Sequence, residues 1–184
     1  MGMYDIKVVH RLFILIIIPL LAMLGLLAMA ISGFSRIDAG VGGLYNDRVV
    51  PLQQLKQISD FYAVNIIDAV NKADHGLLNR DQARDNIRTA QGEIERLWQA
   101  FMATKMTPRE NQLAEQARSQ FSAANAELQR LDAFLQGAPG DLKGQLGAFN
   151  GSLYQSIDPI SGSIGELIQL QLDEAKLARE TATE

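Results

Sequence analysis

Apolar residues recur every three or four positions along most of the chain, which is the spacing of an amphipathic α-helix. Four such stripes follow one another, separated by short polar, glycine-containing or proline-containing segments, and strand-like alternation is absent. The stripes predict helices over about residues 34–76, 80–104, 108–136 and 141–182. Helices of this length joined by short loops form an up-down-up-down four-helix bundle, so the expected fold class is all-α.

Each expected helix is defined by its own apolar positions. The first stripe comprises Val41, Leu44, Val49, Leu52, Leu55, Ile58, Tyr62, Ile66, Ala69 and Ala73. The second comprises Ala83, Ile87, Ala90, Ile94, Leu97 and Phe101, and the third Leu113, Ala117, Phe121, Ala124, Leu128, Leu131 and Leu135. The fourth comprises Leu146, Phe149, Leu153, Ile157, Ile160, Ile164 and Leu167 and then continues less regularly.

Prolines and caps mark where these helices bend, begin and end. Pro51 and Pro159 lie inside the first and fourth helices, where each removes a backbone hydrogen bond and is expected to bend the axis. The segment "DHGLLNRD", residues 74–81, ends the first helix, with Gly76 as the expected C-terminal cap. Thr107, Pro108 and Glu110 form the pattern of a capping box at the start of the third helix.

The chain begins with a long apolar run before the first stripe. Residues 12–35 carry no charge, and Leu12 to Ile31 match the length of about 20 residues that a helix needs to cross a bilayer. Ala28 to Ala30 imitate a signal-peptidase site, but the apolar run is longer than that of a secretory signal, which favours an uncleaved anchor. A membrane-spanning helix is therefore expected over residues 12–33. Lys7 and Arg11 place residues 1–11 in the cytoplasm and residues 34–184 outside it.

Composition and charge remove several function classes. With 17 basic and 21 acidic residues the net charge is −4, so nucleic acid is an unexpected partner. The chain has no cysteine, which excludes disulfides and thiolate metal sites and leaves packing to hold the domain. His10 and His75 are the only histidines and neither has a nearby catalytic partner in the sequence. We expect no catalytic residues, no metal site and no cofactor, and hence no enzyme.

Two regions are candidates for binding a small acid. Antiparallel registry places Lys72 level with Arg84, and Arg88 lies one turn further along the second helix, where guanidinium groups could bind a carboxylate. Acidic residues crowd the same end of the bundle, so ion pairs on a solvated surface are the alternative interpretation. The second candidate is a polar strip beside the core stripes: Asn65, Asp68 and Lys72 on the first helix, and Asn150 and Tyr154 on the fourth. Trp98 is expected in the core.

At "LYNDRVVPLQQLKQISDFYAVNIIDAVNKADHG", residues 44–76, and "LYQSIDPISGSIGELIQLQLDEAK", residues 153–176, the chain resembles the four-helix-bundle sensor domain of methyl-accepting chemotaxis receptors. The resemblance implies a homodimer in the bacterial inner membrane, with the bundle in the periplasm and the ligand at the subunit interface between first and last helices. It also implies a second membrane span and a cytoplasmic signalling region, which this chain lacks, so we expect a fragment. Asp47 and Arg48, within the resemblance, are expected to be structural.

The resulting hypothesis is an extracytoplasmic ligand-sensing module of a chemoreceptor that binds a small organic acid and shifts its fourth helix. Two alternatives stay open. The same sensor could serve a different output, such as a kinase or a nucleotide cyclase. A bundle with a single anchor could instead dock a protein partner and bind no small molecule.

Overall fold

The computed structural model describes residues 8–138 and 140–181, which divide between two compact units, residues 1–44 and 45–184. In the first unit the described residues form one helix, α1 (Val8–Leu44), which contains Pro19. Within it, Leu15–Gly33 is long and apolar enough to cross a membrane, and it is the one such helix among the described residues. None of this segment is buried by protein, as expected for a surface that lipid would cover.

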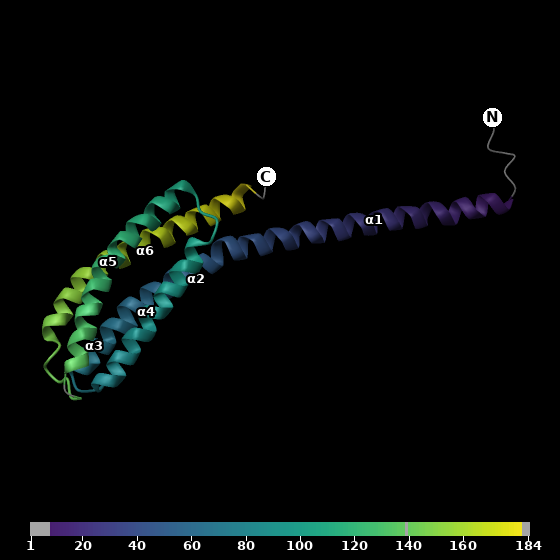
Figure 1. The fold of residues 1–184 in the computed structure, drawn as a ribbon. Helices are drawn as coiled ribbons and strands as arrows, with labels where there is room; N and C mark the ends of the chain where they lie inside the picture. The colour runs from purple at the N-terminus through teal and green to yellow at the C-terminus, as the bar shows by residue number, and fades with distance from the viewer. Residues whose placement is uncertain (1–7, 139, 182–184) are drawn as a thin grey trace. The chain divides into compact units, whose positions relative to one another are not determined.

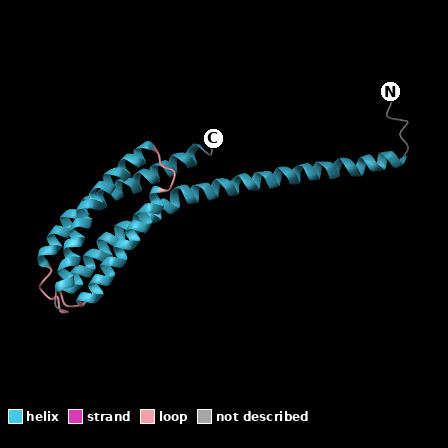
Figure 2. Ribbon diagram, in the orientation of Figure 1, coloured by secondary structure: helices cyan, strands magenta, loops and turns pink. Residues whose placement is uncertain are grey.

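The second unit is a four-helix bundle. Its first helix is built from η1 (Tyr45–Val49), α2 (Val50–Asp60), η2 (Phe61–Ile66) and α3 (Ile67–Asp74). The other three are α4 (Arg80–Met102), α5 (Pro108–Gly137) and α6 (Gly147–Thr181). The segments α2 and α3 pack against both α4 and α6, and α5 packs along α6 (Figure 1). Apart from loops at the two ends of the bundle, the described residues are helical and contain no strand (Figure 2).

The first helix is less regular than its sequence predicts, because η1 and η2 are π-helical. A π-helical turn accommodates an extra residue, so it rotates the side chains that follow it around the helix axis. From the end of η2 onward the predicted positions Ile66, Ala69 and Ala73 are buried, and so are Ile67 and Val70 beside them. Val49 was expected in the core and is 44% exposed, because it lies in η1, where no residue is buried.

Pro51 lies in the first turn of α2, immediately after η1. Val49 and the residues before it are already helical, so Pro51 lies inside a continuous helix, where it removes one backbone hydrogen bond. Its ring is buried. In α6 the helix runs through Pro159 without ending there.

The end of the bundle that contains Gly76, which we call the Gly76 end, holds the loop between α3 and α4 and the loop between α5 and α6. Hydrogen bonds there join the end of the first helix to the residues just before α6. Gly76 adopts φ +74°, and the amides of Gly76 and Leu77 donate to the carbonyls of Ala73 and Lys72, as in a Schellman cap. The predicted cap is therefore confirmed. Asp74 Oδ1 accepts a hydrogen bond of 2.6 Å from the amide of Leu146.

This bond explains why α6 begins at Gly147 and not near residue 141 as expected. The Asp74 carbonyl accepts from the Gly144 amide, and Gly144 itself adopts φ +72°. Residues 141–146 therefore form a turn docked on the end of the first helix, with Leu142 and Leu146 fully buried. The docking depends on a contact between residues distant in sequence, which helical periodicity does not report.

The core follows the predicted stripes of α4 and α5 throughout, and every position named for those two helices is buried. An aromatic cluster joins three of the four helices: Tyr62, Trp98, Phe101 and Phe121. The rings of Trp98 and Phe121 meet edge to face at a centroid distance of 4.7 Å, and those of Tyr62 and Phe121 lie 5.8 Å apart. Trp98 is thus part of the core, as expected.

Capping boxes begin both α4 and α5. Thr107 Oγ1 accepts from the Glu110 amide while the Glu110 carboxylate accepts from the Thr107 amide, so the predicted capping box is confirmed. Asn79 and Gln82 form an equivalent box at the start of α4, which the sequence analysis missed. These caps fix the starts of both helices. The box at the start of α5 also holds the Glu110 carboxylate in place.

Candidate functional site

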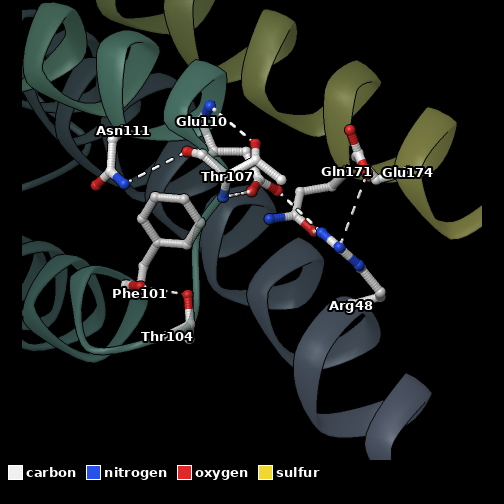
Figure 3. A network of polar contacts seen from close by, with 8 residues as sticks. All are labelled: Arg48, Phe101, Thr104, Thr107, Glu110, Asn111, Gln171 and Glu174. Atoms are coloured by element: carbon white, nitrogen blue, oxygen red, sulfur yellow. Dashed lines mark hydrogen bonds and ion pairs between the residues drawn. The ribbon is translucent and has the colours of Figure 1, made fainter.

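A polar network connects the first helix with α5 and α6 at the end of the bundle where η1 begins (Figure 3). Arg48 Nη1 donates to Glu110 Oε1 at 3.0 Å and to Gln171 Oε1 at 3.2 Å. Arg48 Nη2 lies 4.0 Å from Glu174 Oε2. We call Arg48, Glu110, Gln171 and Glu174 the Arg48 network. One guanidinium therefore links three helices, and two of its contacts are with α6.

The network is formed largely inside the protein. The side chain of Glu110 is completely buried and that of Arg48 is 18% exposed. Gln171 is also completely buried, and its Nε2 has no hydrogen-bond partner among the described residues. A buried charge is tolerated only when it is paired and hydrogen-bonded, and the Thr107 amide and Arg48 together supply those bonds to Glu110.

Sequence reasoning missed Glu110 and Gln171 as interhelical residues, although a signal was present. Glu110 lies three positions before Leu113, the first residue of the α5 stripe, and Gln171 lies four positions after Leu167 in α6. Each polar residue therefore continues an apolar stripe into the bundle interior. Arg48, which was expected to be structural, does contact other helices.

At the Gly76 end, Arg84 and Arg88 converge on one carboxylate. Arg84 Nε lies 2.6 Å from Asp132 Oδ1, and Arg88 Nε lies 3.6 Å from the same oxygen. The hydrogen bond from Arg84 is the main reason why the pKa of Asp132 falls to about 2. Both guanidinium groups thus have an internal anion as partner, which is the ion-pair arrangement that the sequence left open. An external carboxylate would have to compete with Asp132.

The three polar residues predicted as a strip on the first helix, Asn65, Asp68 and Lys72, have different surroundings. Asp68 and Lys72 form an ion pair of 2.6 Å with each other, one turn apart. Asn65 is exposed and borders a cavity of about 190 Å³ together with Asp60, Phe61, and Glu93 and Arg96 of α4. Asn65 lies within η2, where the π-helical turn changes its direction relative to a regular helix.

On α6, Tyr154 is 45% exposed and Asn150 is half-buried with an unpartnered Oδ1. In the described part of the chain, no hydrogen bond or ion pair joins Asn65, Asp68 or Lys72 to either of them. The first helix and α6 nevertheless pack against each other along α2, η2 and α3. A single subunit thus presents these predicted site residues as two separate groups on neighbouring helices.

No group of three or more potential metal ligands occurs among the described residues. The contacts described above are hydrogen bonds and ion pairs, most of them between helices.

Comparison with known proteins identifies the family. Residues 5–184 match the four helix bundle sensory module for signal transduction. The chain belongs to this family. It is 35% identical over 163 residues to the methyl-accepting chemotaxis protein NahY of Pseudomonas putida, an alignment that covers 86% of this chain and 30% of that protein. No solved structure matches the chain.

The sensory-module family gives the bundle its role in signal transduction, and it is not a catalytic family. The chain spans less than a third of the chemotaxis protein that it resembles. Membership in a family of chemoreceptor sensory modules also accounts for the combination of an apolar N-terminal helix with a helical bundle. The ligand and its binding site have to be argued from the residues of this chain.

Proposed function

We propose that this chain is the extracytoplasmic ligand-sensing module of a chemoreceptor in the bacterial inner membrane. Residues 1–11 lie in the cytoplasm, residues 12–33 span the membrane, and residues 34–184 form the periplasmic sensor. Family membership and the apolar segment Leu15–Gly33 support this arrangement. The basic residues Lys7 and Arg11 before the apolar run favour its orientation.

The module works as a homodimer that contacts its second copy through the first helix and α6. Val64 is 57% exposed and Tyr154 is 45% exposed, which leaves apolar surface on both helices for such a contact. A small organic acid binds at this interface, where Asn65, Asp68 and Lys72 of one helix and Asn150 and Tyr154 of the other supply polar groups. Arg84 and Arg88 form a secondary basic surface that is occupied by Asp132 in the absence of ligand.

Ligand binding shifts α6 relative to the first helix. The observation that carries this proposal is the Arg48 network, which joins those two helices directly through Arg48 and Gln171. A ligand changes the balance between two helix positions only by binding one of them more tightly. The contacts of Arg48 with Gln171 and Glu174 are those that differ between the two positions.

Engineered thiols test this proposal, because the chain has no cysteine of its own. Val64→Cys places one thiol on the proposed dimer face and Ser119→Cys places one on the exposed surface of α5, where it serves as the control. In cells with a permeabilised outer membrane, both variants should react with a membrane-impermeant maleimide. Reaction only after lysis would show that the bundle is cytoplasmic and would overturn the proposal.

The same variants test the dimer. Under mild oxidation the full-length Val64→Cys chain in membranes should form a disulfide-linked dimer, whereas Ser119→Cys should remain monomeric. A small organic acid that binds at the interface should change the rate of cross-linking, and Asn65→Ala should reduce this response. Equal cross-linking of the two variants would contradict a dimer through the first helix.

A further inference from the structure

A cavity of about 320 Å³ opens between α4 and α5, on the side of the bundle formed by its second and third helices. These two helices make fewer contacts with each other than α5 makes with α6. The cavity is lined by Glu95, Trp98, Gln99, Met102, Arg118, Phe121, Ser122 and Asn125. Its volume is at the lower end of the range for small-molecule sites, about 300–1,000 Å³.

Two aromatic side chains form the inner wall of the cavity. Trp98 is 4% exposed and Phe121 is 7% exposed, and both belong to the aromatic cluster that fixes the core. Their rings are therefore held rigidly from below by Tyr62 and Phe101. A rigid aromatic surface binds an apolar group with little loss of side-chain entropy.

Trp98 also carries an unsatisfied donor. Its Nε1 is buried and has no hydrogen-bond partner among the described residues. A buried N–H without a partner is unfavourable, and an acceptor that reaches it removes this cost. Buried indole N–H groups usually have such a partner, and none is present here in residues 8–138 and 140–181.

The rim of the cavity carries one anion and one cation, contributed by different helices. Glu95 of α4 accepts a hydrogen bond from Gln99 through Oε1 only, at 2.7 Å. Burial, and after it the Glu95 charge, raises the pKa of the Tyr62 phenol, which lies behind Phe121 in the aromatic cluster. Arg118 of α5 lies 4.0 Å from Glu115, and no other ion pair of Arg118 occurs among the described residues.

We propose that this cavity, here called the Trp98 cavity, is a binding site for a small zwitterion with an apolar side chain. The ligand's ammonium group pairs with Glu95, its carboxylate pairs with Arg118 and accepts from Ser122 or Asn125, and its apolar part covers Trp98 and Met102. One charge of each sign on the rim matches a ligand that carries both. The site lies within one subunit, away from the first helix and α6, and does not depend on a dimer.

Trp98 is the single tryptophan of the chain, so its fluorescence reports on this cavity alone. The full-length chain in detergent is titrated with leucine, with leucinamide, which keeps only the ammonium, and with 4-methylpentanoate, which keeps only the carboxylate. We expect a saturable change of Trp98 emission with leucine and about tenfold weaker binding of both analogues, because each lacks one charge-assisted contact. Equal responses to all three, or a response that does not saturate, would overturn the proposal.

Matched variants assign the two charges. Arg118→Gln should weaken the binding of leucine about tenfold or more and leave the binding of leucinamide unchanged. Glu95→Gln should weaken the binding of leucine to a similar extent and leave the binding of 4-methylpentanoate unchanged. Arg96→Gln is the control, because Arg96 is an exposed α4 arginine that borders a different cavity. If Arg96→Gln weakens leucine as much as Arg118→Gln does, the site is wrong.

A second readout is independent of fluorescence. Leucine should raise the melting temperature of the wild-type chain, and Ser122→Leu, which fills the mouth of the cavity from an exposed position, should abolish this increase. Persistence of the increase in Ser122→Leu would also overturn the proposal. Failure here would leave the dimer interface proposed above untouched, because that interface is tested by cross-linking at Val64.

Discussion

Arg48 Nη1 lies 3.0 Å from Glu110 Oε1, and the carboxylate that it contacts is completely buried. The pair joins η1 to the first turn of α5, where Glu110 also completes the capping box of Thr107. One carboxylate thus begins a helix and ties it to a neighbour. The contribution of the two roles to stability can be separated by substitution.

Arg48→Gln should lower stability by about 2–4 kcal/mol, because it leaves Glu110 as a buried charge without its ionic partner. For a chain of this size the melting temperature of the full-length protein in detergent should fall by about 5–10 °C. Arg96→Gln, which removes an exposed ion pair within α4, should change the free energy of unfolding by less than about 0.5 kcal/mol. The double variant Arg48→Gln/Glu110→Gln should be more stable than the sum of the two single losses predicts. Equal melting temperatures for Arg48→Gln and Arg96→Gln would refute the role of the network.

The pair of Arg84 and Asp132 should make stability depend on pH in the acid range. Because the pKa of Asp132 is lowered to about 2 in the folded chain from an ordinary value of 3.8, the folded state favours the charged carboxylate. Its contribution is therefore present above about pH 4 and is lost as the pH falls through about 2. The stability difference between wild type and Asp132→Asn should shrink over this interval. Thermal melts of both chains from neutral pH to about pH 2 measure it, and a constant difference would contradict the assignment.

Gly76 and Gly92 should respond in opposite directions to alanine. Gly76 has φ +74°, so a Cβ there is strained, and Gly76→Ala should cost about 1–2 kcal/mol. Gly92 lies within α4, and a Cβ added to it meets nothing within 4 Å. Gly92→Ala should therefore stabilise the chain by about 0.5–1 kcal/mol through helix propensity. Urea denaturation of the two variants compares them directly, and a shift in the same direction for both would show that the turn is not strained.

Phe121 should matter much more than Phe134, although both lie on α5. Phe121 is 7% exposed and contacts the rings of Tyr62 and Trp98, whereas Phe134 is 36% exposed and contacts Phe149. Phe121→Ala should destabilise by about 3–5 kcal/mol. It should also shift Trp98 emission to longer wavelength as water reaches the ring. If Phe134→Ala had an equal effect on stability, the aromatic cluster would not be the centre of the core.

The stripes of α4 and α5 show what a sequence can predict. Their apolar positions step by three or four without a break, and the structure buries all of them, because burial of one face determines both the helix and its orientation. Thr107 with Glu110, and Gly76, were likewise predictable, since caps depend on residues close together in the chain.

The differences arise where distant residues decide the local structure. The late start of α6 depends on Asp74, which holds Gly144 and Leu146 in a turn. Val49 lies in the π-helical segment η1 and is exposed, and Asn65 lies in η2 and borders a cavity that is also lined by α4. The burial of Glu110 and Gln171 was not predicted, because both are polar residues that extend an apolar stripe beyond its last apolar position.

Trp98 is an instructive intermediate case. Its position on α4 predicted a core residue, and the structure buries it. The cavity beside it depends on the spacing between α4 and α5, and the unpartnered Nε1 depends on the absence of a nearby acceptor. Neither property can be deduced from periodicity, since both concern the space between helices.

The middle of α6 offers no polar anchorage. From Leu153 to Leu170 its described side chains make no hydrogen bond to another helix, and its core contribution is aliphatic: Leu153, Ile157, Ile160, Ile164 and Leu167. Hydrogen bonds to other helices occur before this stretch, where the Ser152 hydroxyl donates to Glu127, and after it, where Gln171 Oε1 accepts from Arg48. The hydrogen bonds that fix the axial position of α6 therefore lie at the two ends of this stretch, and between them the close packing of aliphatic side chains holds the helix in place.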